Sequence, residues 1–391
     1  MKKAQIYVIY SVAIIACLTF QKALSLESYV LFSEGNYSDY ALTNGSYIDT
    51  DPIAFQASNG TVYLFWENHL AWDEWCICNI YMMTNNGTGW SHPISITNDT
   101  FVNKDPFAFQ DKNGILYLFF TSNKSGNYNI YEMINNGFSW SEAKRVTESE
   151  YDDFDPWALE CVNGSVYLFW SRKIENTSNI FQMVRSNNNW SPPERITSLD
   201  GSNIQPTAYQ TYDETIHLYW VNTKFPGLVS DIYTIQNSGT GWSNPIVMTD
   251  SSKKIASPFV ICDRENVTRL YVIEGPHHFS DEINLREFIV NNGSLLLNNT
   301  ITSTHGPSSV GVSRLSSPCA FEDLNGIIRV FGEYRSKIYE LTLPMYGTLP
   351  WTIWENITFN QTLYYSFYPI RNVTYTDGCI QWLLLTPVRA F

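Results

Sequence analysis

The feature that most constrains this chain is a repeat of about 50 residues. One copy spans Asp105–Thr147 and begins D-P-F-A-F-Q-D-K-N-G-I-L-Y-L-F-F. Similar copies span 51–97 and 155–197, and a more divergent copy spans 205–249. Each contains four short β-like runs separated by Asn-Gly or related turns. Such a unit cannot bury its apolar faces alone, so the copies are expected to stack on one another.

These features predict an all-β protein, a β-propeller of four-stranded blades. The run Thr61–Trp66 is β-branched or aromatic at almost every position, as in strands that are covered on both faces. We therefore assign Trp66 and its counterparts Trp170 and Trp220 to the core.

The number of blades follows from counting X-Pro signals. Units begin near residues 51, 105, 155, 205, 257, 317 and 368, and a Trp at 90, 140, 190 and 242 marks the expected fourth strand. The last unit is incomplete, and Tyr37–Thr43 aligns with Trp90–Thr97. We predict seven blades, with strands from both ends of the chain sharing the closing blade. The alternative is six blades with the C-terminal segment as a cap.

Residues 1–25 have the pattern of a targeting segment, and 26–391 are predicted to form one propeller domain. Lys2 and Lys3 precede an apolar run at Ile6–Phe20, and Ala23-Leu24-Ser25 suits signal cleavage. A lipid on Cys17 or a retained anchor are alternatives, and membrane contact is expected only there. The net charge of −14 disfavours nucleic acid as a partner.

Fifteen N-x-S/T sequons, including Asn59, Asn86, Asn163 and Asn292, predict a secreted glycoprotein at the cell surface or outside the cell. Export would permit disulfides, and six cysteines follow the targeting segment. Disulfides and buried free thiols both remain open, whereas a zinc site at Cys76-x-Cys78 lacks further ligands at suitable spacing. The six cysteines are Cys76, Cys78, Cys161, Cys262, Cys319 and Cys379.

The motif N-x-G-x-x-W stands at Asn85–Trp90, Asn135–Trp140 and Asn237–Trp242. It resembles the Asp-box (BNR) turn of sialidase-like propellers, with Asn in place of Asp, and the unit also resembles exported microbial TolB and surface-layer propellers. The resemblance implies the fold. Sialidases also use three arginines, a Tyr–Glu nucleophile and an acid/base Asp, but no motif here matches these groups. No catalytic residue is transferred.

Candidate ligand-binding residues lie near the predicted long-loop face. Asp51, Asp105 and Asp155 open three successive units and could hold a cation or serve in acid/base chemistry at the channel mouth. Alternatively they cap local turns before proline. The remaining candidates are loop residues that could stack on or hydrogen-bond to a sugar, namely Trp72, Trp75, His277 and His278.

An acidic run before the third unit is a weaker candidate, because it lacks the order of a calcium loop. It could supply hard oxygen ligands for calcium, the one cofactor considered, or be a solvated loop. Its residues are Glu148, Glu150, Asp152 and Asp153.

The chain is therefore predicted to be a binding module for a carbohydrate or a cell-surface partner. A sialidase-like glycoside hydrolase or lyase and a structural envelope protein are the alternatives. Carboxylates without a nucleophile or metal signature favour binding over catalysis.

Overall fold

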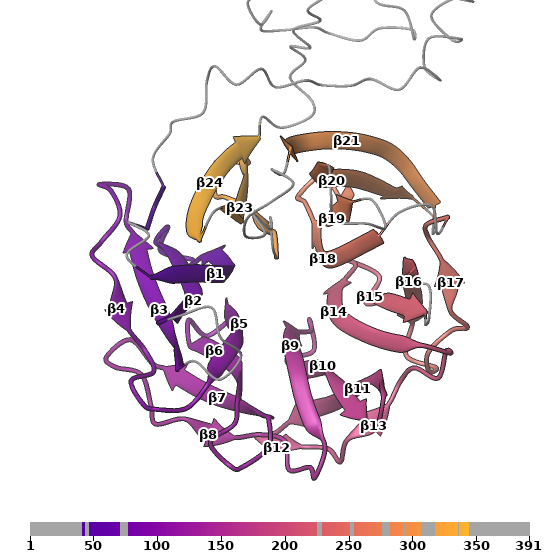
Figure 1. The fold of residues 1–391 in the computed structure, drawn as a ribbon, viewed down its shortest axis with the longest axis horizontal. Coiled ribbons are helices and arrows are strands. Elements are labelled where there is room, and N and C mark those ends of the chain that lie inside the picture. Colours follow the sequence, from indigo (N-terminus) through magenta and orange to yellow (C-terminus); the bar gives the residue numbers. More distant parts are fainter. Residues whose placement is uncertain are drawn as a thin grey trace, which may run out of the picture.

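The computed structural model describes residues 41–43, 47–70, 77–224, 229–250, 254–275, 282–291, 294–305, 317–334 and 336–343. They form six antiparallel sheets arranged as blades around an axis (Figure 1). The fold is an all-β propeller, as predicted. Within the described residues, no helix has the length and apolar character needed to cross a membrane.

The strands follow chain order from the axis outward in each blade. Blade 1 contains β1 (Ile48–Gln56), β2 (Val62–His69), β3 (Cys78–Asn85) and β4 (Ile94–Ser95). Blade 2 contains β5 (Asn103–Gln110), β6 (Leu116–Ser122), β7 (Asn129–Asn135) and β8 (Lys144–Arg145). Blade 3 contains β9 (Asp152–Glu160), β10 (Val166–Ile174), β11 (Thr177–Ser186), β12 (Asn189–Trp190) and β13 (Glu194–Arg195).

The second half repeats the same meander. Blade 4 contains β14 (Ser202–Gln210), β15 (Ile216–Lys224), β16 (Val229–Asn237) and β17 (Ile246–Val247). Blade 5 contains β18 (Lys254–Cys262), β19 (Thr268–Gly275), β20 (Glu282–Asn291) and β21 (Ser294–His305). Blade 6 contains β22 (Cys319–Glu322), β23 (Ile328–Tyr334) and β24 (Lys337–Leu343).

The ring closes with six blades, which corrects the first prediction of seven and matches the alternative. The innermost strand of each blade contacts that of the next, and β1 contacts all three strands of blade 6. No blade stands between them. The seventh unit was inferred from a weak X-Pro match at Pro369 and from strand-like runs at 368–371 and 378–386, which lie outside the described residues.

Hydrogen bonds on the short-turn face also join blade to blade. At the end of the first strand in every blade but blade 5, a glutamine or glutamate accepts a bond from a turn amide of the preceding blade. The pairs are Ser58 N–H with Gln110 (2.7 Å), Lys112 N–H with Glu160 (2.8 Å), Val162 N–H with Gln210 (2.9 Å), Arg264 N–H with Glu322 (2.7 Å) and Leu324 N–H with Gln56 (2.6 Å). The last pair connects blade 6 to blade 1, the junction at which the ring closes.

The core lies between the blades. Trp66, Trp170 and Trp220 are at most 1% exposed, which confirms their assignment. The predicted fourth strands are present but shorter. Of the other repeated tryptophans, Trp190 lies in β12, and Trp90, Trp140 and Trp242 make isolated bridges just before the outermost strands. Each packs edge-on against a phenylalanine of the preceding blade, in the pairs Trp90–Phe331, Trp140–Phe65, Trp190–Phe119 and Trp242–Phe169. These contacts bury aromatic surface at four blade junctions.

The four cysteines that the structure describes, Cys78, Cys161, Cys262 and Cys319, are free thiols. All but Cys262 are buried, in agreement with the second of the two expectations. The other cysteines lie outside the described residues, so disulfides there stay a prediction.

Candidate functional site

The residue before each proline in the first strands has an unusual backbone conformation. Its φ is positive in all six blades: 48° at Asp51, 51° at Asp105 and Asp155, 56° at Gln205, 50° at Ser257 and 42° at Ser317. Non-glycine residues rarely adopt this region. The β-sheet register shifts at this point in blades 1 to 5. The repeat therefore places a bulge near the axis in each of these five blades.

We call these six residues the channel ring: Asp51, Asp105, Asp155, Gln205, Ser257 and Ser317. The three predicted aspartates are all members, and each is partly exposed. The prediction placed them at the rim, where the strands were expected to begin. β1, β5 and β9 start two or three residues earlier than expected, so the aspartates lie near the beginning of these strands.

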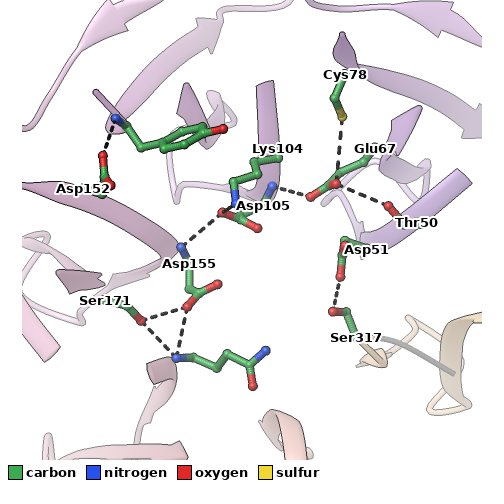
Figure 2. Close-up of polar contacts among 12 residues, drawn as sticks. Thr50, Asp51, Glu67, Cys78, Lys104, Asp105, Asp152, Asp155, Ser171 and Ser317 are labelled. Carbon is green, nitrogen blue, oxygen red and sulfur yellow. Dashed lines mark hydrogen bonds and ion pairs between the residues drawn. The ribbon is translucent and has the colours of Figure 1, made fainter. Parts of the chain in front are cut away.

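Hydrogen bonds connect the channel ring from blade to blade. Asp105 Oδ2 accepts the N–H of Asp155 at 3.5 Å, and Asp155 Oδ2 accepts the N–H of Gln205 at 3.3 Å. Gln205 Oε1 accepts the N–H of Ser257 at 2.8 Å. The hydroxyl of Ser317 donates to Asp51, which closes the junction between blades 6 and 1. The expected local turn caps are thus bonds to the next blade (Figure 2).

At the junction of blades 1 and 2, Glu67 of β2 accepts the corresponding interblade hydrogen bond. Its Oε1 accepts the N–H of Asp105 at 2.5 Å. Ser171 of β10 does the same in blade 3, where its hydroxyl accepts the N–H of Gln205 at 3.0 Å and donates to Asp155 at 2.9 Å. These bonds fix the strained backbone and also orient the carboxylates.

Burial and mutual repulsion make the ring carboxyls weak acids. Burial, followed by the charge of Glu67, raises the pKa of Asp51 well above its usual value. Burial raises the pKa of Asp105 to about 6, and Asp155 adds to the effect. Burial also raises the pKa of Asp155. The ring is therefore acidic but can retain protons that an exposed aspartate would lose.

Lys104 forms an ion pair with one of these carboxylates, Asp105. Its Nζ lies 3.9 Å from Asp105 Oδ2, and 4.6 Å and 5.0 Å from the ring centroids of Phe154 and Tyr128. The charge of Asp105 raises the pKa of Lys104 despite burial, so the amine stays protonated.

A second polar cluster lies beside the ring in blade 1. Glu67 Oε2 is 2.8 Å from His69 Nε2, and the sulfur of Cys78 is 3.6 Å from His69 Nε2 and 3.9 Å from Glu67 Oε2. Although burial opposes both effects, the contact between Glu67 and His69 lowers the pKa of the carboxyl and raises that of the imidazole. Within the described residues, only this group offers three metal-ligating atoms in such proximity. Sequence analysis missed this cluster because Glu67 and His69 lie on β2 and Cys78 lies on β3. Only the pairing of these two strands brings the three side chains together.

The four acidic residues considered for calcium do not share one set of contacts. Asp153 is buried and bound by Arg172 through two hydrogen bonds of 2.7 Å and 2.9 Å. Asp152 accepts the N–H of Tyr128 at 3.0 Å. Glu148 is exposed and 3.3 Å from Arg145, and Glu150 is exposed. Calcium binding here stays a prediction, with Asp153 already engaged by an arginine.

The remaining predicted residues divide into two groups. Trp72, Trp75, His277, His278 and Asn292 lie outside the described residues, as does the targeting segment. Asn59, Asn86 and Asn163 lie on exposed turns, and each side-chain oxygen accepts a local amide, at 3.0 Å, 3.2 Å and 2.9 Å respectively. Their glycosylation stays a prediction.

The arginines that the structure describes have partners away from the ring. Arg172 binds Asp153, Arg185 binds Glu132 at 2.5 Å, and Arg286 is 3.2 Å from Glu274. Arg269 lies between Asp263 and Glu287, at 3.0 Å from each. No described residue thus supplies the three-arginine carboxylate site that the resemblance to sialidases implies.

The Asp-box resemblance holds at the level of the turn. Asn85, Asn135 and Asn237 each accept the N–H of the glycine two residues later, at 2.9 Å, 2.8 Å and 2.8 Å. The asparagine oxygen does what the aspartate of an Asp box would do. These turns are on the periphery of the blades, so their role is structural.

Fold and turns together define a six-bladed β-propeller that resembles the sialidase-like propellers. No model of a known protein family matches the chain. No curated protein matches it at a significant level.

Solved structures with the same architecture do match. A protein of unknown function from Dyadobacter fermentans has a TM-score of 0.61 at 12% identity, over 76% of this chain and 94% of the other. The NanB sialidase from Streptococcus pneumoniae gives 0.54 at 12%, over 77% and 68%. The α-L-arabinanase from Penicillium chrysogenum gives 0.55 at 15%, over 76% and 94%. At these identities the likeness shows the fold alone.

Proposed function

We propose that this protein binds a neutral or amino-bearing carbohydrate at the mouth of its central channel, through Asp105, Asp155 and Asp51. The observation that supports this most is the channel ring itself, in which partly exposed carboxyl groups from three neighbouring blades are held by interblade hydrogen bonds. Fixed acceptors of this kind suit sugar hydroxyls, because their orientation does not have to be paid for on binding.

The charge of the channel ring indicates which class of sugar would bind. A sialic acid would bring a carboxylate to a site already rich in carboxyl groups, and the described arginines are engaged elsewhere. Like charges at short range disfavour binding. Hydroxyl or ammonium groups would instead donate hydrogen bonds to the ring. Structures named as an arabinanase and an arabinofuranosidase with arabinobiose, which share this fold, are consistent with a neutral sugar.

A glycan array with the full chain, expressed in a glycosylating and secreting host, tests the proposal. Retention on neutral or amino glycans is expected, with loss in the double variant Asp105→Asn/Asp155→Asn. Glu142→Gln, an exposed change outside the channel, is the matched control and should bind like the wild type. Retention only on sialylated glycans, or no retention of folded protein, would overturn the proposal and turn the search to a cell-surface protein.

The calcium prediction can be checked in the same experiment. Retention is measured with a chelator and again after calcium is restored. Loss that calcium reverses supports a role for the acidic run from Glu148 to Asp153. Retention unaffected by the chelator removes calcium from the binding step.

A second candidate function is glycoside hydrolysis, as in the solved structures named above. Asp105 Oδ2 is 3.5 Å from the amide nitrogen of Asp155. The two carboxyl groups therefore stand on neighbouring blades, and glycosidases use a pair of carboxyl groups roughly 5 to 10 Å apart. Release of reducing sugar from an array-selected glycan would establish catalysis. Binding without release, in the presence of intact Asp105 and Asp155, would leave recognition as the function.

A further inference from the structure

We propose that Glu67, His69 and Cys78 bind one zinc ion on the face of blade 1 that packs against blade 2. The donors are a carboxylate oxygen, an imidazole nitrogen and a thiol sulfur, all within 4.8 Å of one another. This site uses atoms other than those of the channel ring, so the proposal does not rest on carbohydrate binding.

The register of blade 1 explains why the three side chains meet. Glu67 and His69 are two residues apart on β2, so they point to the same face. Cys78 on β3 is paired directly with His69, so it projects on that face too. The parallel bridge between Cys78 and Val102 and the bond from Glu67 to Asp105 both reach towards blade 2, which identifies the face.

The spacing of the donors fits a tetrahedral zinc ion. Zinc lies about 2.3 Å from sulfur and about 2.0 to 2.2 Å from nitrogen or oxygen, so its tetrahedral ligands are about 3.3 to 3.6 Å apart. Sulfur and nitrogen are 3.6 Å apart here, and sulfur and oxygen 3.9 Å. Nitrogen and oxygen are closer, at 2.8 Å, the length of a hydrogen bond between Glu67 and His69. That pair must separate slightly when zinc replaces the shared proton.

The surroundings orient the ligands. Glu67 is 3% exposed, and its Oε1 is occupied by the N–H of Asp105, which leaves Oε2 directed at the cluster. The hydroxyl of Thr50 lies 3.1 Å from His69 Nε2 and 3.3 Å from Glu67 Oε2. It stands beside the position where a fourth ligand or water would complete the shell.

The donor set also selects the metal. Calcium and magnesium prefer oxygen ligands only, whereas a thiolate with an imidazole favours zinc. The competing explanation is a buried ion pair of Glu67 and His69 beside an inert thiol. That arrangement satisfies the same hydrogen bonds and predicts no stoichiometric zinc binding.

Zinc content decides between these explanations. Tag-free full-length protein is stripped with chelator, supplied with zinc sulfate, dialysed and analysed by elemental mass spectrometry. One zinc per folded chain is expected, and cobalt in its place should give a thiolate charge-transfer absorption. Cys78→Ser should remove that absorption. It should also weaken zinc binding by more than about 100-fold, because loss of an outer-shell partner alone costs about 10- to 100-fold.

The controls use the same residue types outside the cluster. Cys161→Ser removes another buried thiol and His92→Gln an exposed histidine, and both should bind zinc like the wild type. If Cys78→Ser fails to fold, His69→Gln decides, because that side chain is 24% exposed and its loss is better tolerated. Folded wild type without zinc, or unchanged zinc binding in the folded cluster variants, would refute the site.

Discussion

Ile338 on β24 donates its backbone N–H to the hydroxyl oxygen of Thr43 at 3.2 Å, and its carbonyl accepts the N–H of Leu42 at 2.8 Å. The two segments are 295 residues apart in sequence. The same pattern occurs within single blades, where Ile80 N–H donates to Thr97 at 2.9 Å and Ile130 N–H to Thr147 at 2.9 Å. The N-terminal segment therefore takes the outermost strand position of blade 6 and closes the ring.

This closure predicts the effect of Thr43→Ala. The side chain is buried, and its loss leaves the amide of Ile338 without its acceptor. We expect a loss of about 1 to 3 kcal/mol in unfolding free energy, measured by denaturant melts. Thr97→Ala is the matched control, because it removes the same bond from a blade without a chain junction.

Limited proteolysis separates the two variants further. Thr43→Ala should expose the N-terminal segment to cleavage, whereas Thr97→Ala should lose similar stability without that cleavage. Full stability in Thr43→Ala alongside a clear loss in Thr97→Ala would show that the N-terminal strand does not hold the ring.

The closing strand also shows what could be predicted from the sequence. Thr43 aligned with Thr97, so the participation of the N-terminal segment followed from the repeat. The number of blades did not, because an X-Pro pair is a local signal, whereas ring closure depends on the contact of β1 with blade 6. Repetition identifies a unit more reliably than it counts units.

The two candidate sites also differ in how far the repeat could predict them. Asp51, Asp105 and Asp155 were found because they repeat with the blade. Glu67 and His69 meet Cys78 only through the register of β2 and β3 across the 70–77 connection, and no spacing rule covers that loop. Periodicity gives no register for two strands that are separated by a non-repeating connection.

A comparison of two tryptophans tests the buried polar network. Trp66 donates from Nε1 to Asp49 at 2.8 Å, whereas Nε1 of Trp170 is buried without a partner. The reason is that Asp153, which stands where Asp49 does, is bound by Arg172. Both Trp→Phe changes lose similar volume, so the difference between their losses in unfolding free energy reports the contribution of the hydrogen bond.

We expect Trp66→Phe to cost about 1 to 3 kcal/mol more than Trp170→Phe, because only the former removes a hydrogen bond from a buried carboxylate, leaving Asp49 Oδ1 with the bond from Asn68 at 2.8 Å. Denaturant unfolding of the two variants in parallel measures this difference. Equal losses would mean that the bond to Asp49 contributes nothing beyond packing.

The channel ring predicts a pH dependence. Burial raises the pKa of Asp155 in the folded state above the unfolded value of about 3.9. The proton bound to Asp155 therefore stabilises the folded state fully below about pH 4. This stabilisation is lost as pH rises through the folded pKa. Asp155→Asn carries no charge, so it should gain stability relative to the wild type as pH rises above about 4.

Asp213→Asn provides a control of opposite sign. The hydroxyl of Thr211, followed by the N–H of Thr215, lowers the pKa of the exposed Asp213. The advantage of the wild type over this variant is present above about pH 4 and is lost as pH falls through the lowered pKa. Thermal melts across the pH range should show the two differences moving in opposite directions. Parallel curves would contradict the assignment of a raised pKa to Asp155.

The Asp-box resemblance makes a final prediction at Asn135. If its oxygen is what the turn requires, Asn135→Asp keeps the acceptor for Gly137 N–H and should stay within about 0.5 kcal/mol of the wild type. Asn135→Ala removes the acceptor and should cost about 1 kcal/mol. Denaturant melts of both variants measure this. Equal stability of the two would show that the side chain is dispensable, and that Trp140 packing on Phe65 holds this turn in place.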